Sequence, residues 1–393
     1  MAELTGSEIL AKSLRNEGTD VLFFLMGGPM LLAESSCIKE GIRPLDVRHE
    51  QSAAFMSQAY SRLLQKPSVC MAASGPGVIN LTTGIANALI DCCPVVAVGG
   101  SSPISQNGRQ VFQEIDQLAI MKPCTKWADR VYNLKRIPEQ VNFAFQKAMS
   151  GKPGPVYLDF PGDVLYAKIA EEQVDWSLSG RPLLNARPLG DPEKIDALVD
   201  TIAQARQPII LSGSGVIWSK ASQELQEFVE KTGIPFYTTP QGRGVVADDH
   251  EYSYLTMRSA AFRDADLIIV VGTRMNYIIG HAAPPASTVA PRSHASISMP
   301  TKSPPRRAGS ISVSSATVRR CSASSSRPAP SASMRIISPH GGERCQTAKQ
   351  QSARRRAQTS RWTRRRFIRC DCATRSRILC SATPSWWSTG KKS

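Results

Sequence analysis

The sequence predicts an α/β protein with two parallel-sheet domains in residues 1–285, followed by a basic tail. Short runs of apolar and β-branched residues alternate with longer amphipathic segments, a pattern typical of strands buried on both faces and joined by helical crossovers. Glycine or proline follows most of these apolar runs, as the ends of strands favour. From position 286 to 393, serine, arginine, proline and alanine dominate and no apolar period persists. Such a composition predicts disorder.

The net positive charge of the chain is confined to that tail. Residues 286–393 hold 18 Arg and 4 Lys against two acidic residues, a net charge of +20, whereas residues 1–285 hold 26 basic and 30 acidic residues, a net charge of −4. The total of +16 therefore does not indicate that the folded part binds nucleic acid. Binding of nucleic acid through the tail alone stays open as an alternative function. Because the tail has no spaced stacking platform of aromatic residues, we expect no specific nucleic-acid site.

The change of composition at position 286 falls in the middle of a predicted domain. Codons for arginine, serine, proline and alanine abound in GC-rich genes, so we hypothesise that the tail is a shifted-frame translation. Translating the neighbouring frame from the codon after Pro285 tests this idea. The absence of a strand-and-helix pattern in that frame would exclude it.

The first domain, residues 1–169, is expected to form one parallel sheet. A capping box at Thr5 and Glu8 opens the first helix, which runs to about Asn16. The expected strands are 20–25, 44–47, 68–73, 94–99 and 156–160, and further helices are expected to end near 39, to span 51–64, to include Asn80 and to span 138–149. Strands that alternate with helices imply right-handed crossovers and hence a parallel sheet.

The second domain, residues 191–285, repeats this alternation on a smaller scale. Residues 170–190 mix serine, glycine, arginine and proline and are expected to form a linker. The expected helices are 191–205 and 219–231, and the expected strands are 208–211, 235–237 and 266–271. Three strands are few for a domain of this kind, so it is predicted to be a truncated, Rossmann-like middle domain.

The most informative stretch runs from Val47 to Asn80. A short strand is followed by Glu50 at the start of a helix, and the next strand ends in the loop Ser74-Gly75-Pro76-Gly77. The carboxyl ends of parallel strands share one edge of the sheet, where ligands bind. One loop therefore brings a carboxylate to this edge, and the other brings glycines that permit close approach of a ring system. The alternatives are a carboxylate that the helix macrodipole favours and a simple tight turn.

These two loops carry a family resemblance. R-H-E-Q-S-A-A followed by S-G-P-G-V-I-N resembles the pyrimidine-binding domain of thiamin diphosphate enzymes, in the group of acetolactate synthases, benzaldehyde lyase, and 2-hydroxyacyl-CoA and oxalyl-CoA lyases. The resemblance covers residues 4–285. It implies a C–C lyase, decarboxylase or carboligase that acts on 2-oxo or 2-hydroxyacyl substrates. It also implies thiamin diphosphate and Mg²⁺ as cofactors, and assembly as a homo-oligomer or, alternatively, as a non-catalytic partner of a full-length homologue.

The resemblance also assigns site residues. Glu50 is the expected catalytic carboxylate, placed beside N1′ of the aminopyrimidine. The residues expected to contact the cofactor are Gly27, Gly28, Pro76, Gly77, Asn80 and Gln113. Of these, Gln113 is expected near the thiazolium and the substrate, and the two glycines at 27 and 28 line the same cavity. His49 is expected to be structural.

The sequence lacks the family's other half of the cofactor site. Relatives hold the diphosphate and Mg²⁺ through a Gly-Asp-Gly motif and a later Asn, and no Gly-Asp-Gly occurs here. We therefore expect no metal ligands, weak cofactor binding and little or no turnover by this chain alone. Gly213-x-Gly215 is weak evidence for a nucleotide site, and Cys370, Cys372 and Cys380 lack zinc-site spacing. Without a signal peptide or an apolar run of about 18 residues, a cytoplasmic protein that binds no membrane is expected.

Overall fold

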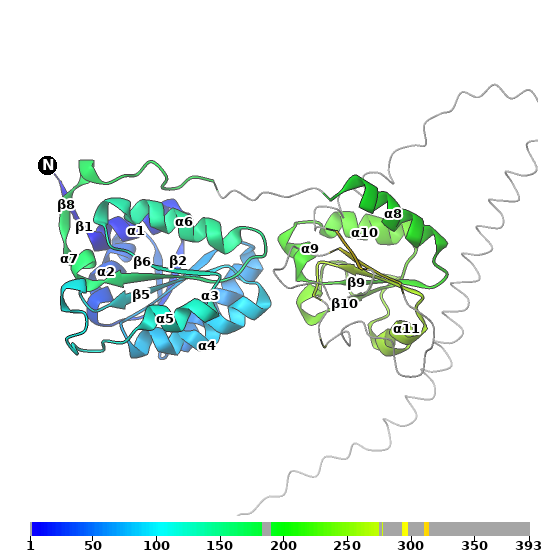
Figure 1. Ribbon diagram of the computed structural model, residues 1–393, viewed down its shortest axis with the longest axis horizontal. Helices are drawn as coiled ribbons and strands as arrows, with labels where there is room; N and C mark the ends of the chain where they lie inside the picture. The colour runs from blue at the N-terminus through cyan, green and yellow to red at the C-terminus, as the bar shows by residue number, and fades with distance from the viewer. Residues whose placement is uncertain (1, 183–189, 275–276, 278–292, 298–309, 314–393) are drawn as a thin grey trace, which may run out of the picture. The chain divides into compact units, whose positions relative to one another are not determined.

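The computed structural model of the chain describes residues 2–182, 190–274, 277, 293–297 and 310–313. These residues have the α/β fold that the sequence predicts, with two separate parallel sheets and helices packed against them (Figure 1). The predictions for the rest of the tail, including the cysteines at 370, 372 and 380, lie outside the described residues. Among the helices of the described part, none combines the length and apolarity needed to cross a membrane.

The first domain is built on a six-stranded sheet in which all neighbouring strands are parallel. The strand order is β3-β2-β4-β5-β7-β6. The strands are β2 (Val21–Leu25), β3 (Arg43–Asp46), β4 (Ser68–Ala72), β5 (Val95–Ser101), β6 (Trp127–Arg130) and β7 (Val156–Pro161). The two central strands β4 and β5 are buried along their whole length, as their continuous apolar sequence predicts.

Helices cover both faces of this sheet (Figure 1). They are α1 (Gly6–Asn16), α2 (Leu31–Lys39), α3 (Glu50–Leu64), α4 (Pro76–Asp91), α5 (Gln117–Met121), α6 (Ile137–Met149) and α7 (Gly162–Tyr166). The helices α1, α2 and α6 pack on one core, and α3 and α4 pack on the other. Side chains alternate between the two cores along β4, where Val69 and Met71 face the first and Cys70 and Ala72 face the second.

Three parts of the first domain differ from the prediction. The edge strand β6 and the short helix α5 are additional, because both are too short for a periodic pattern to reveal. The strand β8 (Lys168–Ala170) pairs antiparallel with β1 (Glu3–Thr5). The following residues also return to this domain, where Val174 is buried in its first core and the Gly180 N–H donates to Glu17. The first part of the stretch expected to be a linker is therefore packed structure.

The middle domain contains a five-stranded parallel sheet. Its order is β10-β9-β11-β12-β13, with strands β9 (Pro208–Ser212), β10 (Phe236–Thr238), β11 (Leu267–Val271), β12 (Ser293–Ile297) and β13 (Ser310–Val313). Its helices are α8 (Pro192–Gln204), α9 (Ser214–Trp218), α10 (Ser222–Thr232) and α11 (Arg258–Asp264). The sequence predicts only the first three strands, so the sheet continues past position 285, where the domain is predicted to end. Helices α8 and α10 pack on one face and α11 on the other.

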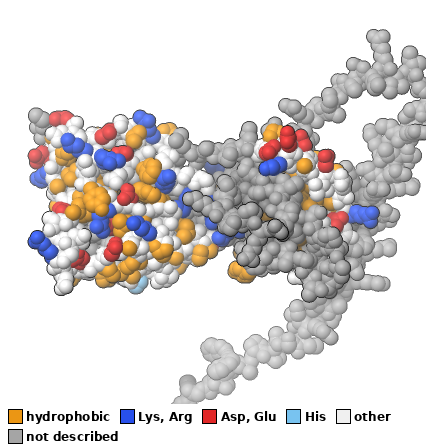
Figure 2. Space-filling view, in the orientation of Figure 1, with side chains coloured by type: hydrophobic (Ala, Val, Ile, Leu, Met, Phe, Trp, Pro, Cys, Tyr) orange, Lys and Arg blue, Asp and Glu red, His pale blue; other side chains and the backbone are white. Residues whose placement is uncertain are grey.

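The surface of the first domain agrees with its nearly balanced charge. Figure 2 shows acidic and basic side chains interspersed on the visible face of this domain, with no large area of a single sign. Interspersed charge gives no broad positive field for a polyanion. The folded first domain therefore offers no support for nucleic-acid binding on that face.

Candidate active site

The candidate site lies at the switch point of the first sheet. The chain runs from β2 to β3 on one side and then returns to β4 on the other side, so the loops after β2 and β4 leave in different directions. Ligands bind at such a point in open α/β sheets. The two loops nevertheless touch at their bases, since a Cβ on Gly27 would come within 2.9 Å of the Ala73 Cβ. Gly28, in contrast, has positive φ and open space where a Cβ would point.

The third loop of the site brings Glu50 to the same edge. The strand β3 ends at Asp46, and His49 caps α3 by accepting a hydrogen bond from the Gln51 N–H on its Nδ1, at 3.2 Å. This cap gives His49 the structural role that the sequence predicts. Glu50 is the first residue of the helix and is only 8% exposed. A carboxylate in the first turn is stabilised by the helix dipole, so its charge is compatible with burial here.

Glu50 is held by residues of the neighbouring helix α4. The Asn80 side-chain amide donates to Glu50 Oε2 at 2.9 Å. On the other side of the carboxylate, a Cβ on Gly77 would lie 3.1 Å from Glu50 Oε1. Pro76 opens α4 in the first-turn position that suits its missing N–H, and Asn80 lies at the start of the second turn of this helix. The structure thus brings Glu50 and Asn80 into direct contact and leaves little room for a side chain at Gly77.

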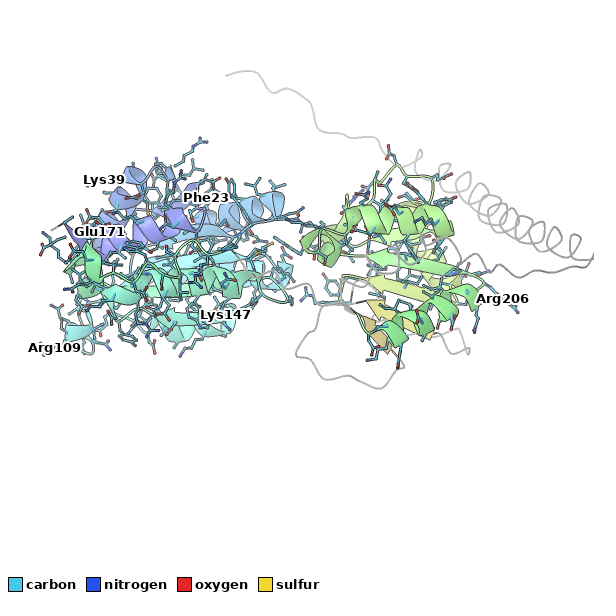
Figure 3. The ribbon with its side chains drawn as sticks, turned by 90° about the horizontal axis from the view of Figure 1, so that it is seen from above. Phe23, Lys39, Arg109, Lys147, Glu171 and Arg206 are labelled. Atoms are coloured by element: carbon cyan, nitrogen blue, oxygen red, sulfur yellow. The ribbon has the colours of Figure 1, made fainter. Side chains whose placement is uncertain are left out.

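The loop before α4 is joined to the segment that carries Gln113. Ser74 Oγ donates to Gln113 Oε1 at 3.1 Å, and both Gly75 and Gln113 have positive φ. A Cβ on Gly75 would lie 2.3 Å from the Gln113 carbonyl oxygen, so only glycine fits. Figure 3 shows Arg109, from the same β5–α5 connection, at one end of the domain. The structure therefore places Gln113 beside the glycine loop, although the sequence separates the two by nearly forty residues.

A buried hydrogen-bond network that the sequence does not predict supports this loop. Gln117 Oε1 accepts a hydrogen bond from the Gly75 N–H at 2.8 Å. Its Nε2 lies 2.8 Å from the Gly100 carbonyl oxygen, 2.8 Å from the Tyr157 hydroxyl and 2.6 Å from Asp159 Oδ1. Gln117 is 1% exposed and Asp159 is fully buried. A single glutamine in D-Q-L carries no periodic or motif signal, so only the fold reveals this role.

The network is balanced in charge. Arg130 pairs with Asp159 through its Nε, and Ser101 Oγ donates to Asp159 Oδ2 at 2.9 Å. Burial lowers the pKa of Arg130, but the charge and hydrogen bond of Asp159 more than offset this effect and raise it. Burial, together with the charge of Asp159, raises the pKa of the Tyr157 hydroxyl well above its usual value. Tyr157 therefore stays a neutral donor, at 2.8 Å to Asp159 Oδ1.

Neither a metal centre nor an open phosphate loop accompanies this site in the described part of the chain. No group of three or more His, Cys, Asp or Glu side chains among those residues could hold a metal ion. In the middle domain, the Gly213 N–H donates to the Val271 carbonyl and the Gly215 N–H to the Gly272 carbonyl. A Cβ on Gly215 would lie 2.7 Å from Gly272 Cα. Close packing of two loops thus explains both glycines without a nucleotide.

Two models of known protein families match separate parts of the chain. The N-terminal TPP binding domain of thiamine pyrophosphate enzymes matches residues 4–120, and the central domain of these enzymes matches residues 195–302. The chain belongs to the thiamine pyrophosphate enzyme family. The match of the central domain continues past position 285, in agreement with the strand β12. Enzymes of this family use thiamin diphosphate and Mg²⁺.

Individual relatives share the same region. The chain is 35% identical over 283 residues to 2-hydroxyacyl-CoA lyase of Arabidopsis thaliana, which covers 70% of this chain and 49% of the relative. It is 32% identical over 278 residues to oxalyl-CoA decarboxylase of Escherichia coli, with shares of 70% and 49%. It is 34% identical over 281 residues to the "Probable acetolactate synthase large subunit" of Methanocaldococcus jannaschii, with shares of 70% and 48%. The chain therefore spans about half the length of these relatives.

Proposed function

We propose that this chain supplies the aminopyrimidine side of the active site of a thiamin diphosphate-dependent C–C lyase, decarboxylase or carboligase. The observation that carries the proposal is the buried Glu50 carboxylate at the switch point, held by Asn80 and lying against Gly77. A buried carboxylate at a glycine-bearing loop can accept a hydrogen bond from a ring nitrogen that carries a hydrogen, as in the imino tautomer of an aminopyrimidine, while the ring lies against the backbone. These residues fit the pyrimidine half of the cofactor.

Each of these residues has a separate role at the aminopyrimidine ring. Glu50 would accept a hydrogen bond from the ring nitrogen in the imino tautomer, in which that nitrogen carries a hydrogen, and Asn80 fixes the orientation of the carboxylate. Gly77 keeps the space beside Glu50 Oε1 free of a side chain, and Gln113 lies where it can face the substrate side of the loop. When bound, thiamin diphosphate supplies the carbanion chemistry, and the protein contributes position and electrostatics.

The described residues include none that fit the diphosphate half of the cofactor. The 393 residues contain no Gly-Asp-Gly, and the described residues offer no acidic metal cluster. Mg²⁺ and the two phosphates carry most of the cofactor's charge, so their ligands contribute most of its electrostatic anchoring. We therefore propose that this chain binds the cofactor weakly and has little or no turnover alone. Its substrate class is a 2-oxo acid or a 2-hydroxyacyl or oxalyl thioester, and its assembly is a homo-oligomer or a complex with a longer homologue.

A chimera tests the proposed role of Glu50. Residues 1–302 of this chain are joined to the C-terminal half of the A. thaliana lyase, which supplies the region beyond the match. We expect thiamin-dependent cleavage of a 2-hydroxyacyl-CoA by this chimera and a loss of at least about 100-fold in kcat with Glu50→Gln. The unmodified chain is expected to give no thiamin-dependent product. Measurable turnover of a 2-hydroxyacyl-CoA, oxalyl-CoA or pyruvate by the chain alone would contradict the proposal.

Glu17→Gln is the matched control for this substitution. Glu17 also accepts a hydrogen bond from an asparagine amide, at 3.0 Å from Asn142, but Glu17 is the C-cap residue of α1 and Asn142 lies in α6, so neither belongs to the loops of the site. Glu17→Gln therefore removes an equivalent charge and leaves the loops intact. An equal loss of activity in both variants would show that Glu50 acts only through the stability of the domain.

A further inference from the structure

We infer that Gln117 is the positioning residue of the loop 73–77, holding the start of α4 in the arrangement that keeps Gly77 beside Glu50. This inference rests on the proposed function, because it concerns the same site. It begins with the Gly75 N–H, which donates to Gln117 Oε1 at 2.8 Å. Gly75 is the N-cap of α4 and has no side chain to cap the helix. Gln117 thus supplies, from another segment, the acceptor that fixes this turn.

The orientation of the Gln117 amide is fixed by its surroundings. Its oxygen faces a backbone N–H, which can only donate, and its Nε2 faces the Gly100 carbonyl oxygen, which can only accept. The Asp159 carboxylate also faces Nε2, at 2.6 Å. A flipped amide would place its NH2 group against the Gly75 N–H and its oxygen against the Gly100 carbonyl oxygen. These buried groups would then lack hydrogen-bond partners, which is energetically costly. The Gly75 N–H therefore always meets an oxygen.

The backbone of Gln117 is fixed as well. It is the first residue of α5, whose N-cap Asp116 accepts a hydrogen bond from the Ala119 N–H at 3.1 Å. Four residues earlier, Gln113 accepts a hydrogen bond from Ser74. The segment 113–117 thus contacts the loop 73–77 at two points.

The conformation of the loop also determines the space beside the Glu50 carboxylate. Gly75 has φ 58° and ψ −112°, a conformation that a freed loop would leave because few backbone states resemble it. Pro76 and Gly77 follow directly, and Gly77 lies against Glu50 Oε1. A change in the Gly75 turn would therefore move the residues that define the space beside Glu50.

The experiment compares Gln117→Leu with Gln58→Leu in the full chain. Gln58 is also a buried glutamine bonded at both ends of its amide, to Asp91 and Asn87, but it joins α3 to α4 far from the loop 73–77. Three quantities are measured: amide hydrogen exchange at Gly75, the midpoint of thermal unfolding, and the Kd for thiamin. Tyr157→Phe, which keeps Gln117 and its bond to Gly75, serves as a milder second variant should Gln117→Leu fail to fold.

We expect Gln117→Leu to accelerate exchange at Gly75 by at least about tenfold and to weaken thiamin binding by about tenfold, as the loss of one buried hydrogen bond allows. Gln58→Leu should lower the unfolding midpoint similarly, with exchange at Gly75 and the Kd unchanged. Tyr157→Phe should accelerate exchange at Gly75 by about two- to threefold. Unchanged exchange at Gly75 in Gln117→Leu, or in Tyr157→Phe where that variant replaces it, would overturn the inference. So would an equal change in Gln58→Leu. If the parent chain binds no thiamin, the proposed function fails, while exchange at Gly75 still decides the role of Gln117.

Discussion

Glu34 gives the sharpest quantitative prediction for the first domain. This residue of α2 is 2% exposed, and neither carboxylate oxygen has a hydrogen-bond partner. Burial, with a smaller contribution from the charge of Asp46, raises the pKa of Glu34 from 4.5 to about 8. The folded protein therefore keeps Glu34 protonated at neutral pH, whereas the unfolded chain ionises it.

The sign and size of the effect follow from this difference in pKa. Below pH 4.5 both states are protonated, and the contribution of the neutral side chain to stability is fully present. As the pH rises from 4.5 to about 8, the unfolded state loses its proton first, so stability is progressively lost. With about 1.4 kcal/mol for each pH unit in this window, Glu34 should lower the free energy of unfolding by about 3 kcal/mol between about pH 5 and about pH 8.

Urea unfolding of parent and Glu34→Gln tests this prediction. The unfolding of the first domain is followed by hydrogen exchange of the β2 and β4 amides at several pH values. The parent should lose about 3 kcal/mol over this pH range relative to Glu34→Gln, whatever constant offset the new amide introduces. Glu40→Gln, at the end of the same helix, controls for the loss of one negative charge. Parallel pH profiles for parent and Glu34→Gln would refute the reasoning.

Three further predictions concern the loops and the network of the site. Gly75→Ala should lower the free energy of unfolding by at least about 3 kcal/mol, because the new Cβ would meet a backbone oxygen at 2.3 Å. Gly41 also has positive φ but has open space where a Cβ would point. Gly41→Ala should therefore lower the free energy of unfolding, measured by urea unfolding, by only about 1 kcal/mol. Asp159→Asn leaves the guanidinium of Arg130 without its counter-charge and should cost about 3 kcal/mol in the same assay; a loss below 1 kcal/mol would contradict this assignment. The Gly108 N–H lowers the pKa of Glu114. Acidification below pH 4.5 should therefore reduce the protection of the Gly108 amide, measured as its exchange rate relative to the intrinsic rate at the same pH, and Glu114→Gln should abolish that pH dependence.

Much of the fold could be predicted from local sequence. The capping box at Thr5 and Glu8 is present with both of its hydrogen bonds, and the continuous apolar runs are the central strands β4 and β5. The local sequence is sufficient to predict these elements, because a helix cap and a strand buried on both faces each depend on only a few consecutive residues. The edge strand β6 is only four residues long and is half-buried throughout, so its sequence lacks the apolar run that marks a strand.

The site could be predicted only in part. Glu50, Gly77 and Asn80 could be placed together because two strand-end loops of a parallel sheet must share an edge. The contact between Gln113 and Ser74, and the support of Gly75 by Gln117, depend on how the long β5–α5 connection folds back. No periodicity specifies such a path. The role of the buried Asp159 could not be predicted either, because the sequence does not show which partner neutralises a single acidic residue within an apolar strand.

The most direct test of the account is the comparison of thiamin with thiamin diphosphate as ligands of the purified chain. Both are titrated with and without Mg²⁺ while NMR follows the side-chain amide of Asn80. The account predicts saturable shifts at this amide, Kd values within about threefold of each other with no effect of Mg²⁺, and at least about tenfold weaker binding of both ligands by Glu50→Gln. Absence of a saturable shift at Asn80, or unchanged binding by Glu50→Gln, would contradict the claim that this edge of the sheet binds the aminopyrimidine.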